Sequence, residues 1–236
     1  VLARLESRHK GVRGNALRAA VLGANDGLVS NTSLVMGVAG AAFSATAVLL
    51  SGLAGLLAGA ISMALGEWLS VQSSRELHQS QIRVERDEII AMPEEEAEEL
   101  ALIYQAKGMS PQEAEKAARD VMDDPDAFLD TKVREELGID PEELGGSAWE
   151  AAIASFFLFA VGAIVPVIPF FFLTGGSAVF FSLGLAGVGL FLLGGTTALI
   201  TGTGLLRTGL RSLILGLVAA GVTYGIGTLL GTAVGG

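Results

Sequence analysis

The sequence of 236 residues contains no cysteine and only two histidines, His9 and His78. Without cysteine the chain can form neither disulfide bonds nor thiolate metal sites, and it has no thiol nucleophile. Two histidines are too few for a histidine-rich metal site. Any bound metal ion must therefore be held mainly by carboxylate, thioether or backbone oxygen ligands.

Sequence motifs of common catalytic and nucleotide-binding sites are missing as well. The chain has no P-loop, no nucleophile elbow and no His-Glu-x-x-His sequence, so we expect no enzyme activity and no ATP-driven step within this chain. We also expect no tightly bound cofactor. The net charge of −10 argues against a nucleic-acid partner.

Charged residues are absent from long stretches, and 51% of the residues are hydrophobic with a positive mean hydropathy. A helix that crosses the hydrocarbon core of a bilayer needs roughly 20 mostly apolar residues. Five segments meet this requirement: 19–41, 46–71, 148–173, 178–201 and 209–233. They predict an all-α polytopic membrane protein with five transmembrane helices and a helical cytoplasmic insert between spans two and three. The predicted parts are a basic N-terminal segment 1–18, spans one and two in 19–71, the insert 72–147, and spans three to five in 148–236.

The basic residues predict the topology. Five of the fifteen precede span one, eight lie in the insert, and Arg207 and Arg211 lie between spans four and five. A five-span path with the N-terminus inside places all fifteen on one face, which the positive-inside rule assigns to the cytoplasm. The C-terminus then lies on the opposite side. The opening segment lacks a small-residue cleavage site after an apolar core, so we expect no cleavable signal peptide, and Val1 in place of Met suggests a natural N-terminus upstream.

Apart from Glu150 at the start of span three, Asp26 and Glu67 are the only acids within the predicted spans. A carboxylate at membrane depth is costly and usually faces a bundle interior or a water path. Met63 and Glu67 are four residues apart and share a helix face. Two carboxylates and a thioether between spans one and two would suit a divalent transition metal. The simpler alternatives are that Glu67 reaches the membrane surface and that Met63 only packs.

Two prolines, Pro166 and Pro169, lie within the third predicted span. Proline removes a backbone donor and disrupts the preceding helical turn. We expect a kink or break there, with freed carbonyls that need partners, and we predict that these residues act as hinges.

The insert region between Arg75 and Glu150 holds 22 of the 25 acids against eight bases. A solubilising surface explains most of them. Ser110, Pro111 and Glu113 form a predicted helix start with a capping box. A smaller group of acids is spaced three apart on two helices that face each other across Pro93, with one more acid on the last helix. This predicted cation site consists of Glu85, Glu88, Glu96, Glu99 and Glu136.

The motifs "GANDGLVSNTSLVMGVAGA", "AGAISMALGEWLSVQSSRE", "ERDEIIAMPEEEAEEL" and "VPVIPFF" resemble, in order and spacing, those of the vacuolar iron transporter family of divalent-metal/proton antiporters. The resemblance covers almost the whole chain. It implies that Asp26 is an intramembrane metal ligand, that Met63 is the transport-site methionine, and that the five insert glutamates bind metal.

The resemblance also implies a homodimer with its transport path near span one. The implied activity is export of cytosolic Fe²⁺, often also Mn²⁺, in exchange for protons. The chain looks most like bacterial members, which implies a prokaryotic cell membrane. Plant members carry a further glutamate where this chain has Gly55, and some relatives have methionines where it has Lys132 and Val133. Glu67 lies on the other side of Met63, as in bacterial members with a similar motif.

The sequence therefore predicts a membrane transporter of divalent metal ions that works together with protons and the lipid bilayer. Two alternatives remain open at this point. One is a passive metal channel, and the other is a membrane-anchored metal buffer or sensor whose spans serve only as an anchor.

Overall fold

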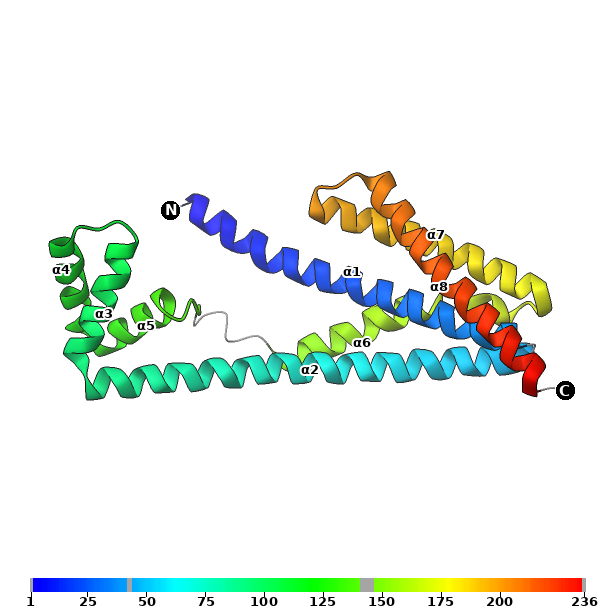
Figure 1. Cartoon of the computed structure of the whole chain (residues 1–236), viewed down its shortest axis with the longest axis horizontal. Helices are drawn as coiled ribbons and strands as arrows, with labels where there is room; N and C mark the ends of the chain where they lie inside the picture. The colour runs from blue at the N-terminus through cyan, green and yellow to red at the C-terminus, as the bar shows by residue number, and fades with distance from the viewer. Residues whose placement is uncertain (1, 42–43, 141–146, 235–236) are drawn as a thin grey trace. The chain divides into compact units, whose positions relative to one another are not determined.

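The computed structural model describes the backbone of residues 2–41, 44–140 and 147–234, and the side chains of 21–41, 44–140, 147–199 and 201–233. Within these residues the structure is entirely helical, as predicted. The helices are α1 (Leu2–Gly40), α2 (Ala45–Ala91), α3 (Pro93–Ala106), α4 (Pro111–Met122), α5 (Pro125–Glu135), α6 (Ala148–Ile164), the 3₁₀ helix η2 (Ile168–Phe171), α7 (Gly175–Thr201) and α8 (Leu205–Val234). Figure 1 shows them along the chain.

The contacts divide the chain into two units. The first, called the apolar unit here, comprises Val1–Glu67 and Ala151–Gly236, and the second, the acidic unit, comprises Trp68–Glu150. Helix α2 is continuous over 47 residues and contributes to both units, so span two continues without a break into the insert, as expected. The predicted end of the insert, 141–146, lies outside the described residues.

Three helices of the described chain are long and apolar enough to cross a membrane: α2, the Gly175–Leu199 part of α7, and the Leu205–Ala233 part of α8. Helix α6 is apolar but shorter, with 17 residues. By length and composition, the described helices therefore support three of the five predicted spans. The basic residues 4, 8, 10, 13 and 18 lie outside the described side chains.

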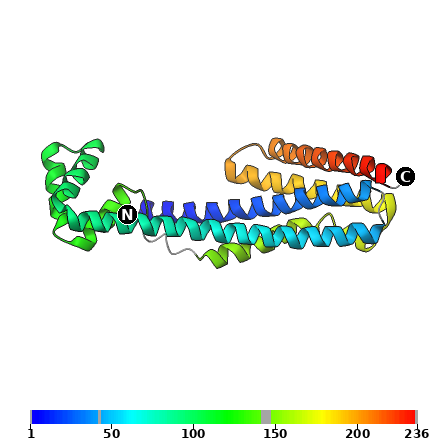
Figure 2. The same ribbon diagram turned by 60° about the horizontal axis from the view of Figure 1, so that its bottom comes forward.

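Within the apolar unit, α1 packs against both α7 and α8, and Figure 2 shows α1 running between α2 and α7. Val35 and Met36 of α1 form a buried core with Val48 of α2 and Ala178 of α7. At the α1–α8 crossing, a Cβ on Gly227 would lie 2.0 Å from the Gly37 carbonyl oxygen. Small residues thus allow direct backbone contact, as is common where membrane helices pack.

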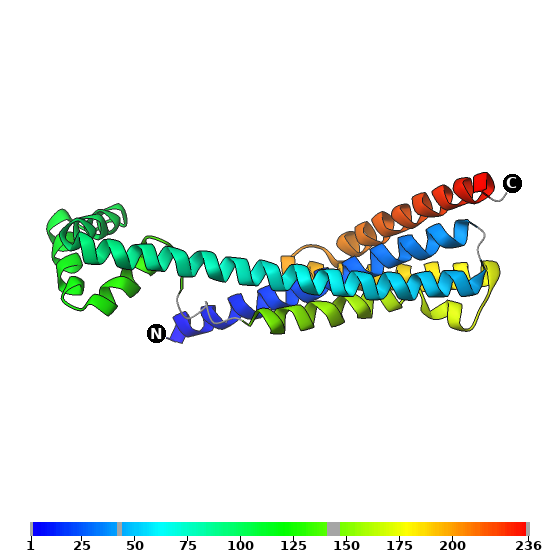
Figure 3. The same cartoon turned by 90° about the horizontal axis from the view of Figure 1, so that it is seen from below.

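Helix α6 approaches α1 equally closely, and Figure 3 shows the two side by side. A Cβ on Gly162 would lie 1.9 Å from the Ala24 carbonyl oxygen, and one on Gly27 would lie 2.2 Å from that of Phe159. Both glycines are required because no side chain fits between the two backbones. The contact fixes the part of α1 that carries Asp26.

The expected break in span three is present. Helix α6 ends at Ile164, and the chain then turns through Pro166 into η2, whose second residue is Pro169. The freed carbonyl of Pro166 accepts a hydrogen bond from the Ser182 hydroxyl at 2.7 Å, in a buried position. The break therefore leaves this backbone oxygen satisfied inside the protein.

In the acidic unit, α3, α4 and α5 pack around a small core that includes Leu100, Ala114 and Phe128, with Ile89 from α2. The predicted start of α4 is confirmed: the Ser110 hydroxyl accepts from the Glu113 backbone N–H, and the Glu113 carboxylate accepts from the Ser110 N–H at 3.2 Å. Hydrogen bonding with Ser110 lowers the pKa of Glu113. The capping box stabilises the first turn of α4.

We predict that Gly162→Ala destabilises the apolar unit. A methyl group at this position overlaps the Ala24 carbonyl, and overpacking of this kind costs about 1–3 kcal/mol. The midpoint of thermal unfolding in detergent should fall. Gly184→Ala on α7 is the matched control, because a Cβ there has no neighbour within 4 Å, and its midpoint should change little. Equal midpoints for the two variants would contradict the backbone contact.

Candidate functional site

The apolar unit contains a cavity of about 370 Å³ between α1, α2 and α6. Asp26 and Ser30 line it from α1, Met63 lines it from α2, and Phe159 lines it from α6. The structure thus brings together two of the three predicted intramembrane ligands. The sequence predicted that Asp26 and Met63 lie on neighbouring spans, and both residues line this one cavity.

The third predicted ligand, Glu67, is not one of the residues that line this cavity. It is half-buried and lies one helical turn beyond Met63 on α2. Met63 itself reaches α1, since a Cβ on Gly23 would lie 3.2 Å from the Met63 methyl carbon. Its thioether is therefore at the α1–α2 contact, where a metal ion between these helices could reach it.

Asn31 lines the same cavity and was not predicted as a site residue. Its amide nitrogen donates to the carbonyl oxygens of Gly52 on α2, at 3.1 Å, and Ala163 on α6, at 2.6 Å. An amide side chain can be placed in either of two orientations, and only its hydrogen bonds decide between them. Because both neighbours are carbonyl acceptors, the NH₂ group of Asn31 must face them, and its oxygen points away from them.

The Asn31 Oδ1 atom is buried and has no hydrogen-bond partner, and the whole side chain is 2% exposed. A buried carbonyl oxygen without a partner is energetically costly. A Cβ on Gly55, which also lines the cavity, would lie 2.8 Å from it. The amide oxygen therefore lies beside the position where plant members of the family that the sequence resembles carry a further glutamate. It is an available neutral ligand for a cation in the cavity.

The acidic unit contains the second candidate site, which we call the carboxylate cluster: Glu85, Glu96, Glu99 and Glu136. Carboxylate oxygens of Glu85, Glu96 and Glu136 all lie within 4.8 Å of one another. Glu85 and Glu96 are buried at 3% and 6% exposure, although they lie on separate helices, α2 and α3. Glu88, the fifth predicted ligand, is exposed and lines a cavity of about 240 Å³ together with Glu85 and Glu136.

The centre of the carboxylate cluster holds Lys132 of α5, which is fully buried. Its ammonium nitrogen lies 2.8 Å from Glu96 Oε2, 3.1 Å from Glu99 Oε2 and 3.2 Å from Glu85 Oε1, and it also pairs with Glu136. Desolvation raises the pKa of Glu85 and Lys132 partly offsets this shift. The cluster is thus a group of carboxylates around a protein cation.

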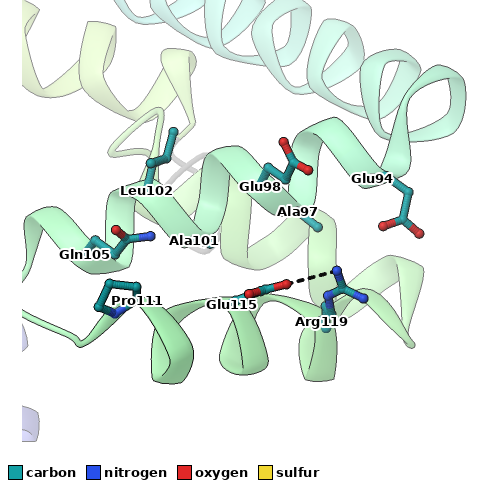
Figure 4. A pocket seen from close by; sticks show the side chains of 9 residues that line it. All are labelled: Glu94, Ala97, Glu98, Ala101, Leu102, Gln105, Pro111, Glu115 and Arg119. Atoms are coloured by element: carbon teal, nitrogen blue, oxygen red, sulfur yellow. Dashed lines mark hydrogen bonds and ion pairs between the residues drawn. The ribbon is translucent and has the colours of Figure 1, made fainter.

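A separate cavity of about 340 Å³ lies between α3 and α4 in the acidic unit. In Figure 4, Glu115 and Arg119 of α4 point toward each other and pair at 3.0 Å, while Glu98 of α3 points away from α4. The small residues Ala97 and Ala101 line it from α3. Glu94, Glu98 and Glu115 line the cavity but are not among the described acids that lie close enough together to hold a metal ion, and we assign it no ligand.

Known proteins of similar sequence identify the family of this chain. A family model described as "VIT family" matches residues 17–228. The chain belongs to the VIT family. It is 33% identical over 217 residues to vacuolar iron transporter 1 of Oryza sativa subsp. japonica, covering 90% of this chain and 84% of the relative. It is 36% identical over 232 residues to the vacuolar iron transporter of Acanthamoeba castellanii, covering 94% and 82%.

Vacuolar iron transporter 1 of Arabidopsis thaliana, also similar to this VIT-family chain, is 32% identical over 215 residues, with coverage of 89% and 84%. The resemblance predicted from the sequence motifs is therefore confirmed at the level of the family. The expectation of a bacterial-type member stays a prediction, and so do the roles of the individual ligands.

Sequence reasoning did not find the roles of Asn31 and Lys132 in this VIT-family chain. Asn31 follows Asp26 by five residues and so lies on a different part of the helix surface, which hides its connection to the same cavity. For Lys132 a signal existed: it precedes Glu136 by four residues, the spacing of an ion pair on one helix face. Its three other partners come from α2 and α3, and only the folded chain places them together.

We predict that Asn31→Ala lowers the thermal unfolding midpoint in detergent. The change removes the donor to the carbonyls of Gly52 and Ala163 and should destabilise the chain by roughly 1–3 kcal/mol. Thr32→Val is the control, since the Thr32 hydroxyl, equally buried, bonds only to Leu28 O of its own helix. If Thr32→Val lowered the midpoint as much as Asn31→Ala, the cross-helix bonds would not be the cause.

Proposed function

We propose that this chain is a membrane transporter that moves Fe²⁺, and also Mn²⁺ or other divalent transition metals, out of the cytosol in exchange for protons. Membership of the VIT family and relatives named vacuolar iron transporters support a metal cargo. The observation that carries the proposal is the cavity of the apolar unit, which Asp26, Asn31 and Met63 all line. An acid in an apolar helix bundle is otherwise difficult to explain.

The proposed topology has five spans: α1, α2, α6 with the chain through η2, α7 and α8. The 17 residues of α6 extend for about 26 Å, a little less than the roughly 30 Å hydrocarbon core, and the apolar chain from Val165 to Phe171 completes the span. The N-terminus and the acidic unit are cytoplasmic and the C-terminus lies on the opposite side. The functional form is a homodimer, as the resemblance implies.

In the proposed transport site, Asp26 supplies a charged oxygen, Asn31 a neutral oxygen and Met63 a thioether sulfur. Such a mixed set favours transition metals of intermediate softness over Mg²⁺ or Ca²⁺. Glu67 supplies a second carboxylate one turn along α2 from Met63. A carboxylate binds either a proton or a metal ion, so protons that arrive from the far side release the metal.

The cytoplasmic glutamates Glu85, Glu88, Glu96, Glu99 and Glu136 collect metal ions from the cytosol. The acidic unit carries an excess of negative charge, which raises the local concentration of cations. The break at Pro166 and Pro169 serves as a hinge while the apolar unit changes its access from one side to the other. The Ser182–Pro166 hydrogen bond, between α7 and this break, supports a defined geometry there.

We predict that Asp26→Asn abolishes most metal flux. The amide keeps the size of the side chain but removes the charge that binds the cation and the proton. The measurement is Fe²⁺ or Mn²⁺ uptake into proteoliposomes with and without an imposed pH gradient. Asp87→Asn, the same change at an exposed acid of α2 that is no proposed ligand, should transport normally.

Wild-type flux in the Asp26→Asn variant would exclude the proposed transport site. Wild-type flux that ignores the pH gradient would instead favour a passive channel. Metal binding to the purified protein without any flux would favour the buffer or sensor.

We further predict that Met63→Leu changes the preference among metals. Leucine has a similar size but no sulfur, so flux of Fe²⁺ and Co²⁺ should fall more than flux of Mn²⁺, which prefers oxygen ligands. Competition between these ions in the same proteoliposome assay measures the ratio. Equal losses for all three ions would assign Met63 a packing role.

A further inference from the structure

Lys132 lies where a bound cation would lie in the carboxylate cluster. All four carboxylates have an oxygen at pairing distance from its ammonium nitrogen. The side chain has 0% exposure, so water does not replace these contacts. The cluster is therefore built around a positive charge that the chain itself supplies.

Four carboxylates surround only three N–H donors. A lysine ammonium can donate three hydrogen bonds, and Glu96, Glu99 and Glu136 accept them. Glu85 Oε1 is buried and pairs with the ammonium charge at 3.2 Å in addition to these three acceptors. With all groups ionised, four negative charges meet one positive charge. The cluster thus retains a net negative charge.

The ammonium group stays charged in this environment. Burial alone lowers the pKa of Lys132, but hydrogen bonds with Glu136, Glu96 and Glu99, together with the charge of Glu85, raise it well above its ordinary value. Because the ammonium group lies between the four carboxylates, a second cation can enter only if the Lys132 side chain moves or if the ion binds beside it.

We propose that Lys132 is a tethered competitor of divalent metal ions in the carboxylate cluster. A divalent ion must displace the ammonium group or bind beside it, so the cluster holds metal weakly and exchanges it readily. This inference takes one point from the proposed function, namely that the cargo is a divalent metal ion. Binding at the cluster is measured independently of transport, so the two ideas can fail separately.

The test is Mn²⁺ binding to the full-length protein in detergent, measured from the electron paramagnetic resonance signal of free Mn²⁺. Asp26→Asn is present in every sample to reduce binding in the apolar unit. Lys132→Gln should strengthen Mn²⁺ binding on the order of tenfold to a hundredfold, because a like charge within about 4 Å of the bound ion is removed. Lys116→Gln, at an exposed lysine of α4, is the matched control and should leave binding unchanged.

A further variant separates site binding from general charge effects. Adding Glu96→Gln to Lys132→Gln should return Mn²⁺ binding to the weak parental level. Lys132→Gln should also unfold at a lower temperature without metal, because buried Glu85 and Glu96 lose their partner, and Mn²⁺ should restore its midpoint. Unchanged or weaker Mn²⁺ binding in Lys132→Gln, or an equal gain in Lys116→Gln, would overturn the proposal.

A measurement on protein with native Lys132 covers the case in which Lys132→Gln does not fold. An amine-acetylating reagent should modify Lys132 much more slowly than exposed Lys116, as followed by mass spectrometry. Saturating Mn²⁺ should accelerate acetylation of Lys132 and leave that of Lys116 unchanged. If Mn²⁺ slowed acetylation of Lys132 or did not alter it, displacement would be excluded and the lysine would be a purely structural counter-ion.

Discussion

A polar group that is removed from water must find a partner, and this constraint shapes both candidate sites. In the apolar unit, the Asn31 amide nitrogen links α1 to backbone carbonyls of α2 and α6. In the acidic unit, Lys132 brings together carboxylates from α2, α3 and the residue that follows α5. Each residue satisfies several groups at once. Asn31 Oδ1 is left without a hydrogen-bond partner, and the carboxylate cluster is left with more negative than positive charge, so each site has capacity for a further cation.

The two sites differ in the ligand atoms that they offer to a cation. The cavity of the apolar unit offers three different kinds of ligand atom and contains no competing protein cation among its lining residues. The carboxylate cluster offers oxygens alone and already holds an ammonium group. A site of the first kind can select an ion, whereas a site of the second kind favours rapid exchange. This division is consistent with the function proposed above, in which metal ions are first collected and then moved.

Much of the architecture follows from the sequence because its signals are local. The break near Pro166 depends on backbone chemistry within one turn, and the Ser110–Glu113 capping box depends on four consecutive residues. Asp26 stands out because so few charges occur in the apolar segments. The centre of the carboxylate cluster could not be predicted in this way. Lys132 is separated from Glu85 by 47 positions, and nothing local indicates that its ammonium group would be fully buried.

The close backbone contact at Gly162 limits how the neighbouring cavity can change its width. The Ala24 carbonyl, two residues before Asp26, meets α6 with no side chain between them. The backbones of α1 and α6 therefore cannot move closer together at this point. The cavity that Asp26 and Met63 line can adapt to a bound group mainly through the rotamers of its side chains.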